Sequence, residues 1–377
     1  EPVVCAVDLL PSLCAIARAP LPKDYRSSGE DMSKALLGTA SARKGDLMWD
    51  FGRNVSFNFP RDAYHRSPSL AIRPDAITPN IDRLAAEGVR FTRFFQATAM
   101  SSATRHCLLT GLYPVRSGAY PNHTRLNDGV GTLPQYLKQA GYRVALEGKR
   151  HIAPIEAFPF EYLSNEQQRT VYPELIEPFL ADVARSGEPF FLYVGSTEPH
   201  DPWNKGDQSL WNPNDLTLPC NLVDTPATRK QFRNYLAEIN ELDNQVGAVD
   251  ALLHKYGLDE NTIFIFTSEQ GYSFPFGKWT CYDEGLHTGF VIRWPGTVKP
   301  GRVTDAMCEY VDVTPTLVDI AGGKIPEGLD GRSFLPVIKG ETDSFKNEVY
   351  GIQTSRGIFF GPEYYAIRSI RNERYAY

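Results

Sequence analysis

Three short runs of mostly apolar residues constrain the fold of this 377-residue chain more than any other feature. They lie at residues 143–146, 190–194 and 262–267, and each has the length of a strand that is buried on both faces of a sheet. Helical patterns separate them, and the longest, at about 226–256, has an apolar residue at every third or fourth position. Strands that alternate with helices predict an α/β fold, with a doubly wound, mainly parallel sheet and helices on both faces.

Polar side chains that can bind an anion follow each of these runs. Lys149 and His151 follow the first run, His200 follows the second, and Lys278 lies shortly after the third. Ligands of a doubly wound sheet bind beyond the carboxyl ends of its strands, so we expect these four side chains to lie in one pocket.

A short helix is predicted over residues 102–110, with Gly111 as its left-handed end. This helix would place Ser101 at the positive end of the helix dipole, which is a natural site for an anion. The helix also has two consecutive leucines, Leu108 and Leu109, which we expect to face inward.

The stretch from Ser101 to Gly111 resembles the signature of the sulfatase family. Ser101, Ala103 and Arg105 match its Cys/Ser-x-Pro/Ala-x-Arg pattern. The pattern continues with two apolar residues, a Thr and a Gly, which are residues 108–111 here. The resemblance implies that a formylglycine-generating enzyme oxidises Ser101 to formylglycine, whose hydrate attacks sulfur and then expels sulfate. Arg105, one turn further on, could reach the hydrate or the sulfate oxygens. A capped helix without any catalytic role is the alternative.

The residues that follow the strands also match motifs of this family. The segment 148–151 resembles its Gly-Lys-x-His signature, which implies that Lys149 binds sulfate and that His151 contacts the formylglycine hydroxyl. His200 matches the Pro-His-x-Pro segment, where it would help to protonate the leaving group. Lys278 matches a second sulfate-binding lysine. Solvated loop residues are the alternative for lone side chains of this kind.

Two further residues are candidates for contact with a substrate. His123 lies shortly after the Ser101 helix, and Trp203 could be a stacking platform for a sugar ring. A plain loop histidine and a buried packing role are the respective alternatives. The resemblance implies a small or carbohydrate sulfate ester as substrate, with an O-sulfo or an N-sulfo bond. The wider superfamily includes phosphomonoester and phosphonate hydrolases, but the Ser-x-Ala-x-Arg signature favours sulfate.

A calcium site is implied only in part. Sulfatases have an Asp followed by Asn, His or Gln after the third strand, and this chain has Glu269 and Gln270, which offer the oxygen donors that calcium takes. The family also has an Asp-Asp pair on a first strand that precedes the Thr-Pro-Asn helix. Before Thr78 this chain has neither that strand nor the pair, and Asp75 is a lone acid. The alternative function is therefore an inactive, sulfatase-like remnant that at most binds an anion or a sulfated sugar.

The two ends of the chain share an order of features. Residues 311–321 repeat the pattern of 7–17, and residues 331–340 repeat that of 29–38. Both copies resemble the sulfatase C-terminal subdomain, a small α+β module. We therefore expect a misplaced copy at 1–73, an α/β core without its first strand at 74–306 and a truncated C-terminal subdomain at 307–377.

Composition excludes several classes of function. The net charge of −6 and the absence of a basic run argue against a nucleic-acid partner. The six cysteines include no C-x-x-C pair, so no zinc site is indicated, although one or two disulfides would be compatible. No stretch approaches the roughly 18 apolar residues of a membrane span, and the first residues do not resemble a signal peptide. The resemblance implies a periplasmic or secreted protein, and the oligomeric state is left open.

Overall fold

The computed structural model of the chain describes residues 9–21, 31–37, 75–164, 170–219, 221–354 and 366–377. The chain forms two compact units, Glu1–His65 and Arg66–Tyr377. In the first unit, α1 (Leu9–Ile16) and α2 (Ser33–Leu36) lie within residues 7–17 and 29–38, where the sequence predicts two helices. The sequence also predicts strands at 47–51 and 69–73 and a helix cap at Asp8, and all three lie outside the described residues.

The larger unit contains two neighbouring sheets with parallel and antiparallel pairs. The first has the order β5-β6-β1-β7, with β8 also paired to β1, and the second has the order β3-β2-β4. Their strands are β1 (Val89–Phe95), β2 (Arg143–Gly148), β3 (Glu161–Tyr162), β4 (Phe190–Gly195), β5 (Phe264–Thr267), β6 (His287–Arg293), β7 (Arg302–Thr304) and β8 (Cys308–Glu309). Strand β6 runs antiparallel to β1 and β5, whereas the other pairs of these two sheets are parallel.

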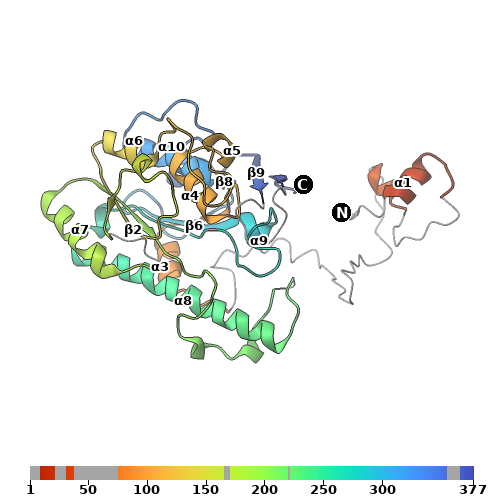
Figure 1. Ribbon diagram of the computed structural model, residues 1–377, viewed down its shortest axis with the longest axis horizontal. Helices are drawn as coiled ribbons and strands as arrows, with labels where there is room; N and C mark the ends of the chain where they lie inside the picture. The colour runs from red at the N-terminus through yellow and green to blue at the C-terminus, as the bar shows by residue number, and fades with distance from the viewer. Residues whose placement is uncertain (1–8, 22–30, 38–74, 165–169, 220, 355–365) are drawn as a thin grey trace. The chain divides into compact units, whose positions relative to one another are not determined.

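Helices cover both faces of the sheets, which confirms the predicted α/β architecture (Figure 1). On one side lie α3 (Pro79–Glu87), α7 (Pro173–Ser186) and α8 (Pro226–Lys255), and on the other lie α4 (Ser101–Thr110), α5 (Pro114–Ser117), α6 (Leu133–Gln139) and α10 (Val313–Ile320). The remaining elements are α9 (Asp283–Leu286), α11 (Leu335–Lys339), the hairpin of β9 (Glu348–Gln353) and β10 (Ile367–Asn372), and short 3-10 turns at Ile155–Ala157, Gln208–Leu210, Pro213–Asp215, Asp259–Asn261 and Tyr310–Asp312.

The three apolar runs are the strands β2, β4 and β5, but they do not account for the whole sheet. Strands β1 and β6 lack a long continuous apolar run, because Arg90 and Arg93 interrupt β1 and β6 begins with His287 and Thr288. Both strands are nevertheless central, because β1 pairs with three other strands. Their place in the sheet depends on tertiary pairing, which the apolar runs alone do not indicate.

Aromatic packing holds α4 over the sheet. Phe94 of β1 stacks on Phe290 of β6 with ring centroids 3.8 Å apart, and Phe334 packs edge-on against both rings. Cys107 and Leu109 of α4 belong to the same core and are at most 1% exposed. The helix that begins at Ser101 is therefore fixed along its length by burial, at roughly 25 cal/mol for each Å² of apolar surface.

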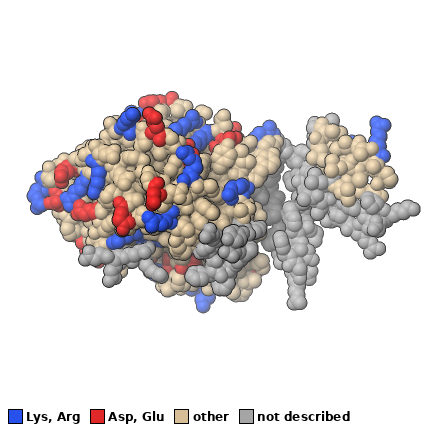
Figure 2. All heavy atoms as spheres, turned by 45° about the horizontal axis from the view of Figure 1, so that its top comes forward, with Lys and Arg blue, Asp and Glu red and all other residues tan. Residues whose placement is uncertain are grey.

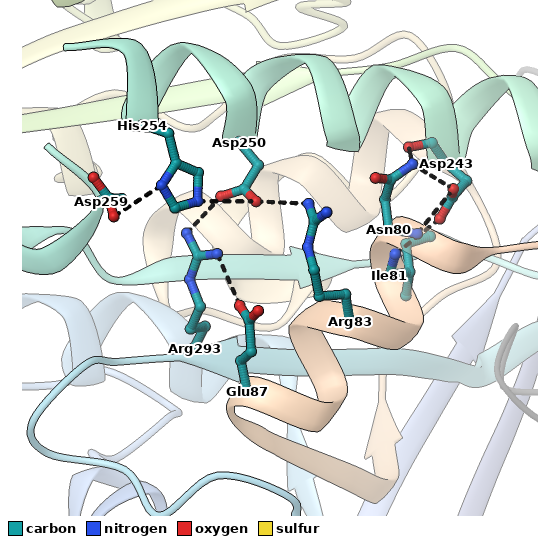
Figure 3. A network of polar contacts seen from close by, with 9 residues as sticks. All are labelled: Asn80, Ile81, Arg83, Glu87, Asp243, Asp250, His254, Asp259 and Arg293. Carbon is teal, nitrogen blue, oxygen red and sulfur yellow. Dashed lines mark hydrogen bonds and ion pairs between the residues drawn. The ribbon is translucent and has the colours of Figure 1, made fainter. Parts of the chain in front are cut away.

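Helix α3 is capped from a distance rather than by its own sequence. The sequence Thr78-Pro79 predicts an N-cap at Thr78, and Thr78 does hold that position, but its side chain makes no capping bond and instead donates to Asp82. The carboxylate of Asp243 on α8 accepts the backbone N–H groups of Asn80 at 3.1 Å and Ile81 at 2.8 Å (Figure 3). A fully buried Asp243 thus satisfies two of the free donors at this helix end.

A second buried carboxylate of α8 ties α3 to β6. Asp250, which is 1% exposed, binds Arg83 of α3 at 2.8 Å and Arg293 of β6 at 2.5 Å (Figure 3). Arg293 also reaches Glu87 at 3.1 Å. Since each buried charge has a partner, the network fixes the position of α3 without leaving an unpaired ion.

Each copy of the proposed internal repeat contains a hydrogen bond at the same sequence positions. The Met32 N–H donates to Ser12 Oγ at 2.8 Å in the first unit, and the Phe334 N–H donates to Thr316 Oγ1 at 3.0 Å in the second. Ser12 and Thr316 occupy matching positions in the two sequence patterns, as do Met32 and Phe334. The internal repeat itself stays a prediction from the sequence.

The described part of the surface has mixed charge. On the face shown in Figure 2, lysine and arginine side chains alternate with aspartate and glutamate, without a continuous basic area among the residues drawn in colour. No helix in the described ranges is long and apolar enough to cross a membrane. The four described cysteines, Cys14, Cys107, Cys281 and Cys308, are free thiols.

Candidate active site

Ser101 begins α4 and is 5% exposed. The helix ends at Gly111, which has φ 70° in the left-handed region, as the sequence predicts. Every residue of α4 is buried, so Ser101 is held rigidly at the positive end of the helix. An anion near Ser101 would meet the partial positive charge of this helix end.

Two predicted site residues contact the Ser101 hydroxyl. Arg105 Nε donates to Ser101 Oγ at 3.4 Å, and His151 Nδ1 lies 3.3 Å from the same atom. His151 Nε2 in turn lies 2.9 Å from His123 Nδ1, which brings His123 to the edge of the site. Burial, with Lys149 and Arg105 nearby, lowers the pKa of His151 to about 3, so that its imidazole is neutral at physiological pH.

Arg105 is almost fully buried and links three strand ends. It forms an ion pair with Glu269 at 2.6 Å and donates to the Lys149 carbonyl at 3.0 Å and to the Tyr193 hydroxyl at 3.2 Å. Burial alone would raise the pKa of Glu269, but Arg105 and Lys149 outweigh it and hold this pKa at about 2. The pair is therefore fully ionised, and Glu269 neutralises part of the positive charge of the site.

His200 and Lys278 form a second contact pair. Lys278 Nζ donates to His200 Nε2 at 2.7 Å, and His200 Nδ1 lies 2.6 Å from the Asp201 carbonyl, which requires a proton on Nδ1. Burial and the nearby Lys278 lower the pKa of His200, and burial lowers the pKa of Lys278. His200 is therefore mainly neutral near pH 7, and within this pair Lys278 holds the proton that faces His200 Nε2.

These two groups belong to one site. Arg105, Lys149, His200 and Lys278 line the same cavity, together with Glu269 and Gln270. Electrostatic effects also connect them, because Lys149 lowers the pKa values of His151, His200 and Glu269. The expected convergence of the loops after the three strands is therefore observed.

Unusual backbone conformations are concentrated in these loops. His123, His151, Phe276 and Trp279 all have positive φ, between 51° and 70°. Residues other than glycine adopt this left-handed region at a cost of about 1 kcal/mol or more, and such strain is typical of functional sites.

Trp203 lies away from the open part of the site. Its ring stacks on Phe274 with centroids 4.6 Å apart and packs against Tyr235, and its Nε1 donates to the Pro199 carbonyl. The packing alternative therefore describes Trp203 better than a sugar platform does. Trp279 is 42% exposed beside Lys278, whose Nζ lies 5.0 Å from the centroid of the Trp279 ring.

Two residues of the site are not evident from the motifs. Tyr193 lies inside an apolar strand, and its hydroxyl is the only sign in the sequence of a polar role. That hydroxyl accepts a hydrogen bond from Arg105. Glu198 has a side chain 1% exposed, accepts from Ser196 Oγ and Gln245 Nε2 at 2.9 Å each, and pairs with Lys205. It thereby anchors the turn that presents His200, two residues later.

The described residues supply only part of a calcium site. The Gln270 amide oxygen and Oε1 of Glu269 are both buried and form no hydrogen bond with the described residues, although this Oε1 lies 2.6 Å from Arg105 Nε in an ion pair. Calcium takes about six to eight oxygen ligands. No group of three or more acidic, histidine or cysteine side chains that could hold a metal occurs in the described ranges, so Glu269 and Gln270 do not form such a site by themselves.

Comparisons with known proteins agree with the motifs. The family model described as Sulfatase matches residues 62–323. An ulvan-active sulfatase of Formosa agariphila is 34% identical over 308 residues, which cover 80% of this chain and 60% of that protein. Human N-sulphoglucosamine sulphohydrolase is 28% identical, over 79% of this chain and 67% of that protein. The chain thus spans about three fifths of the first of these relatives.

The fold is also that of a solved structure from Bacteroides thetaiotaomicron, a protein of glycosaminoglycan metabolism. The TM-score is 0.67 at 24% identity, over 81% of this chain and 79% of the other. This similarity extends the agreement from the sequence to the arrangement of the elements.

Proposed function

The chain belongs to the sulfatase family, and from this premise we propose that it hydrolyses a carbohydrate sulfate ester by means of a formylglycine made from Ser101. The observation that carries the proposal is the convergence of six side chains at the N-terminus of α4. They are Ser101, Arg105, Lys149, His151, His200 and Lys278.

The charge of the site suits a sulfate group. Arg105, Lys149 and Lys278 line the cavity near Glu269, which pairs with Arg105, whereas the nearby Glu198 is paired with Lys205. The helix end at Ser101 adds further positive potential. A tetrahedral oxyanion would therefore be bound by charge-assisted hydrogen bonds, which are about twice as strong as neutral ones.

On the nucleophile side, His151 and Arg105 act on the side chain at position 101. Formylglycine would supply a geminal diol there, which an unmodified serine lacks. The neutral His151 can accept a proton from a hydroxyl at this position through Nδ1, while its Nε2–H donates to His123. Arg105 holds the same oxygen at 3.4 Å.

On the leaving-group side, we assign the proton transfer to His200 and Lys278. Their Nε2 and Nζ atoms are 2.7 Å apart, and the His200 ring is oriented by the Asp201 carbonyl. Lys278, whose pKa burial lowers, carries the proton for the bridging oxygen of the ester, and the neutral His200 orients the ammonium group through Nε2.

A carbohydrate is the substrate class that the rim of the site supports best. Trp279, Phe276 and Tyr282 are 42%, 39% and 57% exposed, and Trp279 adjoins Lys278. Exposed aromatic rings provide apolar faces for a sugar ring. The relatives named above are sulfatases of ulvan and of a sulfated glucosamine, which agrees with this class.

Two observations favour a second function, that of a non-catalytic binder of sulfated sugars. Arg105 is engaged by Glu269 at 2.6 Å, and the described residues do not complete a calcium site. A site of this kind could bind an anion without turning it over.

Co-expression with a formylglycine-generating enzyme that accepts serine separates the two functions. We expect the intact mass to fall by one H₂, and the modified protein to release sulfate from an aryl sulfate and from sulfated oligosaccharides with O-sulfo or N-sulfo groups. The Ser101→Ala variant should bind sulfate but release none. Modified protein that binds a sulfated sugar without turnover would establish the binder instead.

A further inference from the structure

A buried ionic trio lies at the base of the β9–β10 hairpin. Glu309 and Asp312 are at most 1% exposed, and both approach the ammonium group of Lys346, whose Nζ lies 3.0 Å from Asp312 Oδ2 and 3.5 Å from Glu309 Oε2. One lysine thus serves two buried carboxylates. Because an uncompensated charge is costly to bury, the trio is most stable when one of the two acids carries a proton.

Glu309 is the acid that retains this proton. Asp312 lies closer to the lysine and also accepts two backbone N–H groups, those of Glu309 and Arg332, at 3.0 Å each. Glu309 accepts from the Tyr113 hydroxyl at 2.5 Å and from the Tyr350 N–H at 3.1 Å. Burial raises the pKa of Glu309 to about 7, so its charge changes within the physiological range of pH.

The other groups around Glu309 keep a constant charge near neutral pH. Those that face it are the thiols of Cys107 on α4 and Cys308 on β8, the phenols of Tyr113 and Tyr350, the ammonium of Lys346 and the carboxyl of Asp312, with Arg332 beside Cys308. Burial raises the pKa of both thiols and of the Tyr113 phenol, so all three stay neutral. Burial would lower the pKa of Lys346, but Asp312 and Glu309 raise it, so the ammonium stays charged.

The trio fastens the hairpin to the larger unit. Among the described strands, β9 and β10 pair only with each other, and a two-stranded hairpin is only marginally stable by itself. Glu309 binds β9 at the Tyr350 N–H. Lys346 lies two residues before the start of β9 and forms an isolated bridge with Met307. Loss of these contacts would free the first half of β9.

The docked hairpin also braces both sides of the candidate active site. The Ile352 N–H of β9 donates at 2.7 Å to the carbonyl of Ala97, four residues before the start of α4. Arg371 of β10 forms an ion pair with α9, which follows the loop that carries the second sulfate-binding lysine. The two sides meet where the Trp279 N–H donates to the Ala99 carbonyl at 3.0 Å.

Protonation of Glu309 favours the docked hairpin. If the hairpin lifts away, water reaches Glu309 and its pKa returns to the ordinary value of 4.5. The docked state therefore binds more protons than the open state between about pH 4.5 and pH 7, and docking weakens as pH rises through this range.

We propose that Glu309, Asp312 and Lys346 form a proton-operated latch, which fastens the β9–β10 hairpin across the active-site loops when Glu309 is protonated and loosens it when Glu309 is ionised. The latch adjusts the packing of the segments 97–100 and 279–286 to pH, and its residues take no part in the chemistry. It does not depend on the proposed activity, because it operates in the unmodified chain.

Hydrogen exchange of single amides tests the latch in the full, unmodified chain. The reporters are the N–H groups of Tyr350, Ile352 and Trp279, followed by NMR from about pH 5 to pH 8 and corrected for the intrinsic pH dependence of exchange. We expect the opening equilibrium that all three report to rise by at least about tenfold across this range, because the docked and open states differ in proton uptake.

Two variants and one control assign the effect to Glu309. Glu309→Gln keeps the shape of the protonated acid and cannot ionise, so the opening equilibrium should lose its pH dependence. Tyr113→Phe removes a donor that favours the ionised form, so the midpoint of the change should move to higher pH. Glu348→Gln, at an exposed acid of the same hairpin, should behave like the unsubstituted chain.

Several results would overturn the latch. An opening equilibrium that does not change with pH would show that docking takes up no proton. A retained pH dependence in Glu309→Gln would assign the proton to another group, and an unchanged midpoint in Tyr113→Phe would do so even if Glu309→Gln failed to fold. A response at Tyr350 and Ile352 without one at Trp279 would show that the hairpin is not coupled to the active-site loops.

Discussion

Arg105 meets three partners of different chemistry, namely a carboxylate, a carbonyl and a hydroxyl. Its guanidinium is 6% exposed, and its planar fork can satisfy all three at once, which a lysine could not do. Burial would lower the pKa of Arg105, but Glu269 raises it, so the charge is retained. The balance between Arg105 and Glu269 thus sets how strongly the site attracts an anion.

The variant Glu269→Gln should shift this balance. Removal of the carboxylate leaves Arg105 buried without its ionic partner, so we expect a loss of about 2–4 kcal/mol in the free energy of unfolding. It should also strengthen the binding of inorganic sulfate, because the competing anion is gone. Urea denaturation and calorimetry measure the two effects. The control Glu373→Gln, in an exposed pair with Arg93, should change stability by less than about 1 kcal/mol, and weaker sulfate binding in Glu269→Gln would contradict the prediction.

His151 should make the stability depend on pH. Its pKa is about 3 in the folded chain against an ordinary value of 6.5, so the unfolded chain binds more protons between these values. The folded state therefore loses stability as pH falls below about 6.5. His151→Gln should flatten this acid-side loss in urea denaturation from about pH 4 to pH 8, while His254→Gln, at a histidine 56% exposed, serves as the control. An unchanged pH slope in His151→Gln would show that the histidine does not contribute.

Sequence reasoning at this scale works where a residue type has a definite chemistry. The sequence was enough to identify Lys149, His151, His200 and Lys278 as site residues, because charged and imidazole side chains follow soon after apolar strands. Tyr193 could not be identified in this way, because an aromatic residue in an apolar strand gives no sign that its hydroxyl accepts a hydrogen bond from Arg105. The pairing of Glu269 with Arg105 was also not predictable, because it joins residues far apart in the sequence.

At the scale of elements, the turn after β4 depends on a buried acid. Burial would raise the pKa of Glu198, but Lys205, Gln245 and Ser196 lower it, so Glu198 remains ionised inside the protein. We regard it as a positioning residue for His200.

Glu198→Gln should lower kcat about tenfold or more, with a smaller change in KM, because His200 loses its alignment rather than its chemistry. The readout is steady-state kinetics of the formylglycine form. The matched control is Glu238→Gln, another buried acid, which accepts the N–H groups of Asn204 and Lys205 in the same loop. Equal losses of kcat in both variants would indicate a general effect of the loop.

The cap of α3 gives a separate test of element packing. Asp243→Ala leaves the N–H groups of Asn80 and Ile81 without their acceptor, so we expect a loss of about 1–3 kcal/mol in the free energy of unfolding. Asp207→Ala, which removes an exposed local cap of the turn at Gln208–Leu210, should cost less. Urea denaturation compares the two, and equal costs would mean that the Asp243 contact adds nothing beyond an ordinary cap.

The elements best predicted from the sequence are those whose signals are local. The end of α4 at Gly111 and the long helix α8 follow from periodicity and from glycine chemistry. The cap of α3 does not, since the sequence indicates Thr78 and the structure uses Asp243, 163 residues from Asn80. Strands β1 and β6 were likewise not predictable from local sequence, because their burial comes from the strands they pair with.

At the scale of the whole molecule, mutations can test the two corresponding hydrogen bonds, one in each copy of the repeat. Ser12→Ala and Thr316→Val each leave one buried N–H unsatisfied, at Met32 and at Phe334, at a cost of about 1–3 kcal/mol. Each variant should speed hydrogen exchange of the amide in its own copy only, and the effects should add in the double variant. Coupled effects between the copies would contradict two separate modules.

The overall architecture was predictable in kind but not in detail. Alternating strand and helix signals predicted the layers, and the three strand ends predicted where the site lies. The separation of β4 from β5 could not be predicted, because no local pattern shows which strand lies beside which.

The remote cap of α3 has a consequence for the order of biosynthesis. A nine-residue helix is too short to be stable alone, and its acceptor Asp243 is made 163 residues after Asn80. At about 5–20 residues per second, the ribosome needs roughly 8–30 s to cover that interval. The α3 helix therefore lacks its acceptor on the nascent chain, and its cap can form only once residue 243 has been translated.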